Sequence, residues 1–167
     1  RMLNSATLHA VVYLPYIALA GIASLMLSFL YPMASISLMY LMFALWFLSL
    51  CLFDSVVSMF CSSPVLGSIA VVVAYIALWI PGLAICNVMR RGSVWWLIVS
   101  VFPPSSLYVF GILLSHFEQL GLGLRWEHIS LNIIEEENKG IVTLAGLLAV
   151  ISSSTLFQGL FLCINDV

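Results

Sequence analysis

Residues 116–126 concentrate more reactive side chains than any other part of this chain. They read His-Phe-Glu-Gln-Leu-Gly-Leu-Gly-Leu-Arg-Trp and follow an apolar segment. Glu118 and Arg125 flank two glycines, so we expect an ion pair across a turn. Gly121 is expected to supply a left-handed cap after a helix, and Gly123 a tight bend. Roles in structure are favoured here over direct contact with a substrate.

Asp54 is the second candidate, because it is the only charged residue between Arg1 and Arg90. A carboxylate at the centre of a membrane costs about 2.5–3.5 kcal/mol on insertion scales, so it should face the interior of a helix bundle or water. The functional alternatives are a polar contact with substrate or a proton site. The structural alternative is a wet residue near the end of its helix, bonded to Ser58.

The patterns of enzymes and of metal sites are missing from the sequence. Gly121-x-Gly123 follows no strand and lacks the third glycine of a dinucleotide site, and no Gly-x-x-x-x-Gly-Lys-Ser/Thr phosphate loop occurs. Neither the three histidines nor the four cysteines are spaced as metal ligands. We therefore predict that this chain is not an enzyme by itself and binds no metal or cofactor.

The composition places these residues in a membrane protein. The chain is 63% hydrophobic and only 7% charged, whereas soluble domains carry about 25% charged residues. Such a chain cannot cover itself with a water-compatible surface, so we predict an integral, multi-pass membrane protein. The net charge of −2 offers no basic surface, which argues against a nucleic-acid partner.

The fold that the sequence predicts is all-α, with four transmembrane helices. A spanning helix needs about 20 apolar residues, and four segments are long enough. They are expected at residues 8–30, with Pro15 inside as a kink, 35–60, 65–88, broken late by Pro81 and Gly82, and 141–164. The connections at 31–34 and 61–64 are so short that neighbouring helices must be antiparallel.

Residues 93–120 are expected to form a helical hairpin before the last span. Residues 93–102 and 105–120 are two apolar helical segments, and Pro103 and Pro104 break the chain between them. Each is too short to cross a bilayer, which favours a re-entrant hairpin buried against protein. The alternative is one amphipathic helix on the membrane surface after a loop. A polar loop over 121–140 follows, with Trp126 as an anchor at the membrane interface.

Two blocks, residues 102–111 and 117–126, resemble the membrane domain of ABC transporters of subfamily A, which are eukaryotic lipid exporters. The family pattern is roughly Ser-Pro-x-x-Phe-x-x-Gly, a helix, and then Glu-x-x-Gly-x-Gly-x-x-Trp. The residues that match it are Pro104, Gly111, Glu118, Gly121, Gly123 and Trp126. Residues 58–60 and 163–167 are similar to two weaker signatures of the same family.

The resemblance implies one partial transmembrane domain. The four spans would correspond to the third to sixth spans of a six-span half, and residues 93–120 to the exoplasmic hairpin of that half. The first two spans, the large exoplasmic domain and the nucleotide-binding domain, with its ATP and Mg²⁺, would lie outside the chain, which we expect to be a fragment. The implied partners are membrane lipids and the remaining spans and nucleotide-binding domains of the same protein.

Two rival functions and the orientation stay open at this point. The rivals are an ion-coupled secondary carrier that uses Asp54, and a membrane-embedded scaffold subunit. Four of the five Lys and Arg residues would lie on the exoplasmic side under the family topology, whereas the positive-inside tendency places them in the cytosol. They are Arg90, Arg91, Arg125 and Lys139. The sequence names neither the lipid, nor the direction of transport, nor the membrane.

Overall fold

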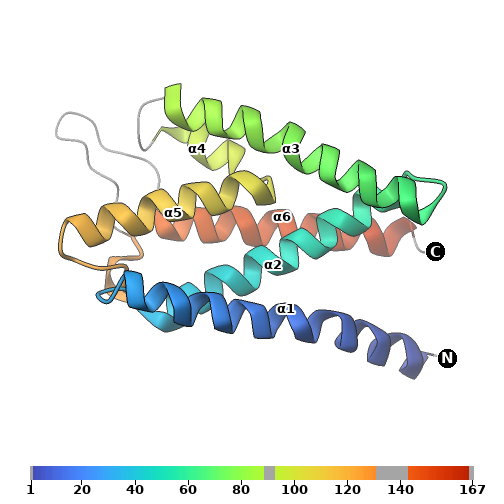
Figure 1. The fold of residues 1–167 in the computed structure, drawn as a ribbon, viewed down its shortest axis with the longest axis horizontal. Helices are drawn as coiled ribbons and strands as arrows, with labels where there is room; N and C mark the ends of the chain where they lie inside the picture. The colour runs from blue at the N-terminus through green and yellow to red at the C-terminus, as the bar shows by residue number, and fades with distance from the viewer. Residues whose placement is uncertain (1, 89–92, 131–142, 166–167) are drawn as a thin grey trace.

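The computed structural model describes residues 2–88, 93–130 and 143–165, and this part of the chain is entirely helical apart from its connections (Figure 1). Its six α-helices are α1 (Met2–Leu30), α2 (Ile36–Met59), α3 (Pro64–Val88), α4 (Val94–Val99), α5 (Pro103–Gln119) and α6 (Leu144–Asn165). One turn of 3₁₀-helix, η1 (Trp126–His128), follows α5.

Three of these helices are long and apolar enough to cross a membrane, namely α2, α3 and α6. At 1.5 Å per residue they measure about 33–37 Å, which exceeds the roughly 30 Å hydrocarbon core of a bilayer. Large apolar side chains stay exposed along them, for example Val65 and Ile69 on α3 and Phe157 on α6. The protein is therefore an integral, multi-pass membrane protein, as the composition predicted.

The predicted span at residues 8–30 stays a prediction. Helix α1 is continuous through Pro15, and its apolar stretch Leu14–Leu30 is by itself shorter than a full span. Predicted and observed bounds of α2 and α3 agree within one residue. The start predicted for the last span, residue 141, and the polar loop over 131–140 lie outside the described residues.

The helix breaks predicted at Pro81 and at Pro103–Pro104 differ from those in the structure. Helix α3 was expected to break at Pro81 and Gly82, yet it continues to Val88. Its neighbour α4 stops at Val99, before the expected residue 102, and α5 already begins at Pro103. The break therefore precedes the two prolines, because proline needs no N–H partner in the first turn of a helix and its fixed φ suits that position.

The core gathers around α2, which packs against α1, α3, α5 and α6. Its buried residues Leu38, Met39 and Phe43 meet Phe110 and Leu113 of α5 in one apolar cluster. Figure 1 shows both termini at one end of the bundle, and the α1–α2 connection with the C-terminal end of α5 at the other. We call the latter the turn end; α3 finishes there, and α6 starts there.

Candidate functional site

Helices α4 and α5 form a hairpin that leaves the turn end and comes back to it (Figure 1). Residues 100–102 make the tight turn between them. Phe102 is extended, with φ −92° and ψ 129°, which is the conformation that a following proline favours. Its carbonyl oxygen accepts the backbone N–H groups of Ser105 and Ser106 at 3.1 and 3.0 Å. The two prolines thus start α5 sharply.

The turn of this hairpin is held midway along the bundle by the middle of full-length helices. The indole N–H of Trp46 on α2 donates to the carbonyl oxygen of Pro103 at 2.7 Å. The Ser154 hydroxyl on α6 donates to the carbonyl oxygen of Val101 at 2.9 Å. Both Trp46 and Ser154 lie about 15 Å from the turn end of their helices. The hairpin therefore reaches about half the length of its neighbours.

Gly82 on α3 allows the closest approach to the hairpin. A Cβ atom at Gly82 would overlap the hydroxyl oxygen of Ser105 and lie 2.9 Å from its Cβ. The same hydroxyl lies 3.5 Å from the carbonyl oxygen of Leu78, next to the position where Pro81 has no N–H to donate. The Pro81–Gly82 pair was predicted as a break in α3. Instead, α3 is continuous there and packs against the N-terminus of α5.

Helix α5 presents two faces with different surroundings. The face with Val109, Phe110, Leu113, Leu114 and Phe117 is buried. Leu107 is only half-buried and lies on the other face.

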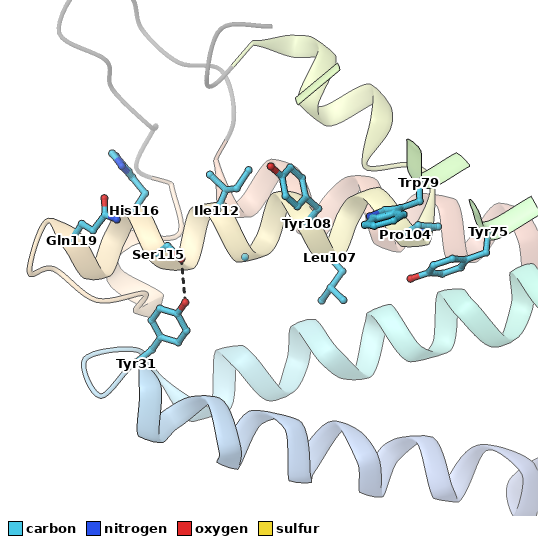
Figure 2. Close-up of a pocket in the computed structure, with 11 residues that line it drawn as sticks. Tyr31, Tyr75, Trp79, Pro104, Leu107, Tyr108, Ile112, Ser115, His116 and Gln119 are labelled. Carbon is cyan, nitrogen blue, oxygen red and sulfur yellow. Dashed lines mark hydrogen bonds between the residues drawn. The ribbon is translucent and has the colours of Figure 1, made fainter. Parts of the chain in front are cut away.

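That second face of α5 lines a groove of about 770 Å³. Its members follow one another at spacings of three and four residues, so a single helical face forms the floor. Tyr75 and Trp79 of α3 and Tyr31 at the end of α1 complete the walls (Figure 2). The α5 residues are Pro104, Leu107, Tyr108, Gly111, Ile112, Ser115, His116 and Gln119.

Polar groups of this groove gather at the turn end. Figure 2 shows Ser115, His116 and Gln119 there, with the Tyr31 hydroxyl 3.1 Å from the hydroxyl of Ser115. Midway along, the Tyr108 hydroxyl donates to Asn87 Oδ1 at 3.2 Å. Of the groove residues, the sequence had pointed to Pro104 and Gly111, and to His116 and Gln119 within the 116–126 stretch. The polar residues at helical spacing along α5 were the signal that could have revealed the rest.

The segment after α5 docks on the α1–α2 connection. The ion pair predicted between Glu118 and Arg125 is not formed, and each side chain binds the backbone of Met33 instead. Glu118 Oε1 accepts the Met33 N–H at 3.2 Å, and Arg125 Nε donates to the Met33 carbonyl oxygen at 3.4 Å. The connection lies between the two side chains, so each finds a backbone partner before it can reach the other.

The left-handed conformation predicted for Gly121 is confirmed, with φ +68°, and Gly123 is left-handed too, with φ +65°. A Cβ at Gly121 would meet open space, but one at Gly123 would overlap the carbonyl oxygen of Met33. The next carbonyl oxygen, that of Leu124, accepts the backbone N–H of Ser35 at 2.8 Å. Gly123 is therefore the point where the two connections touch.

Trp126 and His128 complete this docked segment. The Trp126 indole N–H donates to the Ser37 hydroxyl at 2.9 Å, at the start of α2. His128 Nδ1 lies 3.0 Å from the carbonyl oxygen of Gly123, and its ring is parallel to that of Phe117. Trp126 is about half exposed; its predicted role as an interface anchor stays a prediction.

Asp54 lies on α2, near the end opposite the turn end, and is half-buried. The bond to Ser58 that we considered is not formed. Among the side chains that the structure describes, none is hydrogen-bonded to Asp54. In the same described part of the chain, no group of three or more His, Cys, Asp or Glu residues is placed to hold a metal ion.

Comparison with known proteins adds no relative: no family model matches the chain, and no curated protein sequence matches it.

Proposed function

We propose that this chain is part of the transmembrane domain of an ATP-driven exporter that moves lipids across or out of a membrane. The observation that carries the proposal is the α4–α5 hairpin. It enters and leaves at the turn end, and its turn is bonded to Trp46 and Ser154 midway along α2 and α6. In a bilayer this turn would lie near mid-depth, where irregular backbone is tolerated only against protein or water.

In this proposal α1 is a fourth span and α4–α5 is a re-entrant hairpin. Helix α1 is continuous over 29 residues, or about 44 Å, which is long enough to cross. The carbonyl oxygens of Val101 and Pro103 are bonded by neighbouring helices, and the N–H groups of residues 100–102 are bonded within the hairpin itself. The rival placement, an amphipathic helix on the membrane surface, gives no reason for the bonds to the middle of α2 and α6.

The residues that resemble subfamily A exporters support this assignment by their position. Glu118, Gly123 and Trp126 lie in the segment that docks on the α1–α2 connection, and Pro104 and Gly111 line the groove on α5. Closure of ATP-binding domains elsewhere in the protein would rock the helices. The docked segment would make α1, α2 and α5 move together, and lipid would pass along apolar walls.

The direct test is ATP-driven lipid movement by the whole protein reconstituted in phosphatidylcholine vesicles. Transfer of a fluorescent lipid between leaflets, or out to an acceptor, should require ATP hydrolysis. The gene beyond residue 167 should encode a phosphate loop of the form Gly-x-x-x-x-Gly-Lys-Ser/Thr. A protein without such a loop that moves no lipid would contradict the proposal and leave the scaffold subunit.

Asp54 is the observation that keeps an ion-coupled carrier as the second candidate, because its half-buried carboxylate has no hydrogen-bond partner among the described side chains. If the exporter proposal is right, Asp54→Asn should change the ATP-driven transport rate less than about twofold, since the Asp54 carboxylate would be solvated and would have no role in transport. A normally folded Asp54→Asn protein that loses transport, together with dependence on a proton or sodium gradient, would favour the carrier.

A further inference from the structure

The groove on α5 has the length of one leaflet of a bilayer. It runs along one face of the helix from Pro104, next to the hairpin turn, to Gln119 at the turn end. That path is about 22 Å along the helix axis. One leaflet, from the midplane through the head groups, is about 20–22 Å thick. The groove thus extends over the depth that a single lipid molecule occupies.

The polarity of the groove changes along this path as it does along a lipid. The deep end holds Pro104, Leu107 and the rings of Tyr75 and Trp79, with one hydroxyl, that of Tyr75. The turn end brings a hydroxyl pair, an imidazole and an amide together within little more than one helical turn (Figure 2). An acyl chain suits the first environment, and a head group with hydrogen-bonding oxygens suits the second.

The charge of the walls selects the kind of head group. Among the described residues that line the groove, none is Asp, Glu, Lys or Arg. The groups at the turn end are a tyrosine and a serine hydroxyl, a histidine and a glutamine. A head group with a net negative charge would call for Lys or Arg beside it, and an alcohol as small as that of a sterol would leave most of these groups unused.

We propose that this groove binds one zwitterionic phospholipid of the leaflet at the turn end, with its head group at His116 and Gln119 and an acyl chain along Leu107 towards Trp79. The proposal rests on the re-entrant placement of α4–α5 proposed above, but not on ATP-driven export. If the export proposal is also correct, the groove would be a lipid-binding site beside the hairpin on the transport path.

Gly111 offers a way to close the groove without disturbing the core. It lies on the groove face at mid-length, and a Cβ there would meet nothing within 4 Å. Gly111→Leu should therefore fold, because leucine is also the better helix former. Gly159→Leu on α6 is the matched control, since its Cβ would likewise meet nothing within 4 Å and the residue lies outside the groove.

The test is photo-crosslinking of the whole protein in phosphatidylcholine vesicles without ATP, with a phosphatidylcholine that carries a diazirine at the end of one acyl chain or on the head group. Mass spectrometry should map the acyl probe to Leu107 and Trp79, and the head-group probe to His116 and Gln119. Gly111→Leu should lower both yields about tenfold, whereas Gly159→Leu should leave them unchanged.

Three results would overturn the lipid site. The first is acyl labelling no stronger at the groove than at exposed Val72 on α3 and Leu156 on α6. The second is labelling that Gly111→Leu leaves intact, and the third is labelling that an equal amount of sterol or phosphatidylserine removes. Groove labelling in a protein without ATP-driven transport would instead contradict the export proposal alone, so the two failures can be told apart.

Discussion

Three residues of the 116–126 stretch, Glu118, Gly123 and Arg125, join the segment after α5 to the α1–α2 connection. Glu118 and Arg125 bind the N–H and the carbonyl oxygen of the same residue, Met33, from two sides. Gly123 makes this possible, because any side chain there would overlap the Met33 carbonyl oxygen. The residue types therefore matter for fixing α5 to the α1–α2 connection.

Gly123→Ala should destabilise the protein more than Gly121→Ala. Both glycines have positive φ, so each substitution costs about 1–2 kcal/mol for the left-handed conformation. At Gly123 the new Cβ must also push the segment off Met33, which leaves polar groups unpaired and costs about 2 kcal/mol more. Denaturation in detergent micelles, followed by helix content, measures the difference. Equal losses of stability would show that the two connections do not touch at Gly123.

Single residues were predicted to the extent that their role is local. The positive φ of Gly121 follows from the end of an apolar helix and the glycine just after it. The partners of Glu118 and Arg125 do not, because Met33 is about ninety residues away in sequence and reaches them only when α1, α2 and α5 pack. An ion pair across the glycines was the nearest solution that the sequence offered.

At the scale of elements, the placement of α5 and its groove depends on the contacts that hold the turn of the α4–α5 hairpin. Trp46, Ser154 and Gly82 belong to three different helices, and each meets the first residues of α5 or the turn before them. The turn is thereby fixed on α2, α3 and α6 at once. A substitution at one of these three contact residues should therefore displace α5 and the groove that it lines.

Gly82→Ala should displace or destabilise α5, because its Cβ would overlap the Ser105 hydroxyl oxygen. We expect a loss of about 1–3 kcal/mol, as for overpacking in other cores. The double variant Gly82→Ala with Ser105→Gly should recover most of it, although glycine weakens the first turn of α5. Gly67→Ala is the control: its Cβ would lie 3.5 Å from the Ser58 hydroxyl oxygen, an ordinary contact.

Denaturation of the four proteins would decide this point. A Gly82→Ala protein as stable as the parent, or one that Ser105→Gly fails to rescue, would show that α3 and α5 are farther apart than described.

Helix ends were predicted well wherever an apolar run meets a short polar connection, as at both ends of α2. Pro81 was misjudged because proline inside a helix usually removes a backbone hydrogen bond and crowds the preceding turn. In a membrane bundle, contacts with neighbouring helices can compensate for this loss, and here the Ser105 hydroxyl of α5 lies 3.5 Å from the carbonyl oxygen of Leu78 in that turn.

At the scale of the whole molecule, the bundle leaves many large apolar side chains exposed on its outer surface. Helices α1, α3 and α6 carry large apolar side chains on their outer faces, such as Phe29, Ile76 and Leu160. A helix that is apolar all round has no pattern that says which face is inside. For that reason the sequence predicted the spans, but neither the pairing of α3 with α5 nor the groove that forms between them.

The placement of the hairpin governs which side of the membrane each connection reaches. If residues 94–119 enter and return, Val88 at the end of α3 and Leu122 after α5 lie on the same side. Ser62, in the connection between α2 and α3, lies on the opposite side. If residues 94–119 crossed the membrane instead, Val88 and Leu122 would be separated by it. Both residues are exposed enough to label, Val88 at 80% and Leu122 at 41%.

The most direct test is therefore labelling of single cysteines by a maleimide that cannot cross membranes. In a protein whose four native cysteines are replaced, Val88→Cys, Leu122→Cys and Ser62→Cys are compared in sealed vesicles of one orientation. The re-entrant hairpin predicts that Val88→Cys and Leu122→Cys react from one side and Ser62→Cys only from the other. Labelling of Val88→Cys and Leu122→Cys from opposite sides would contradict it.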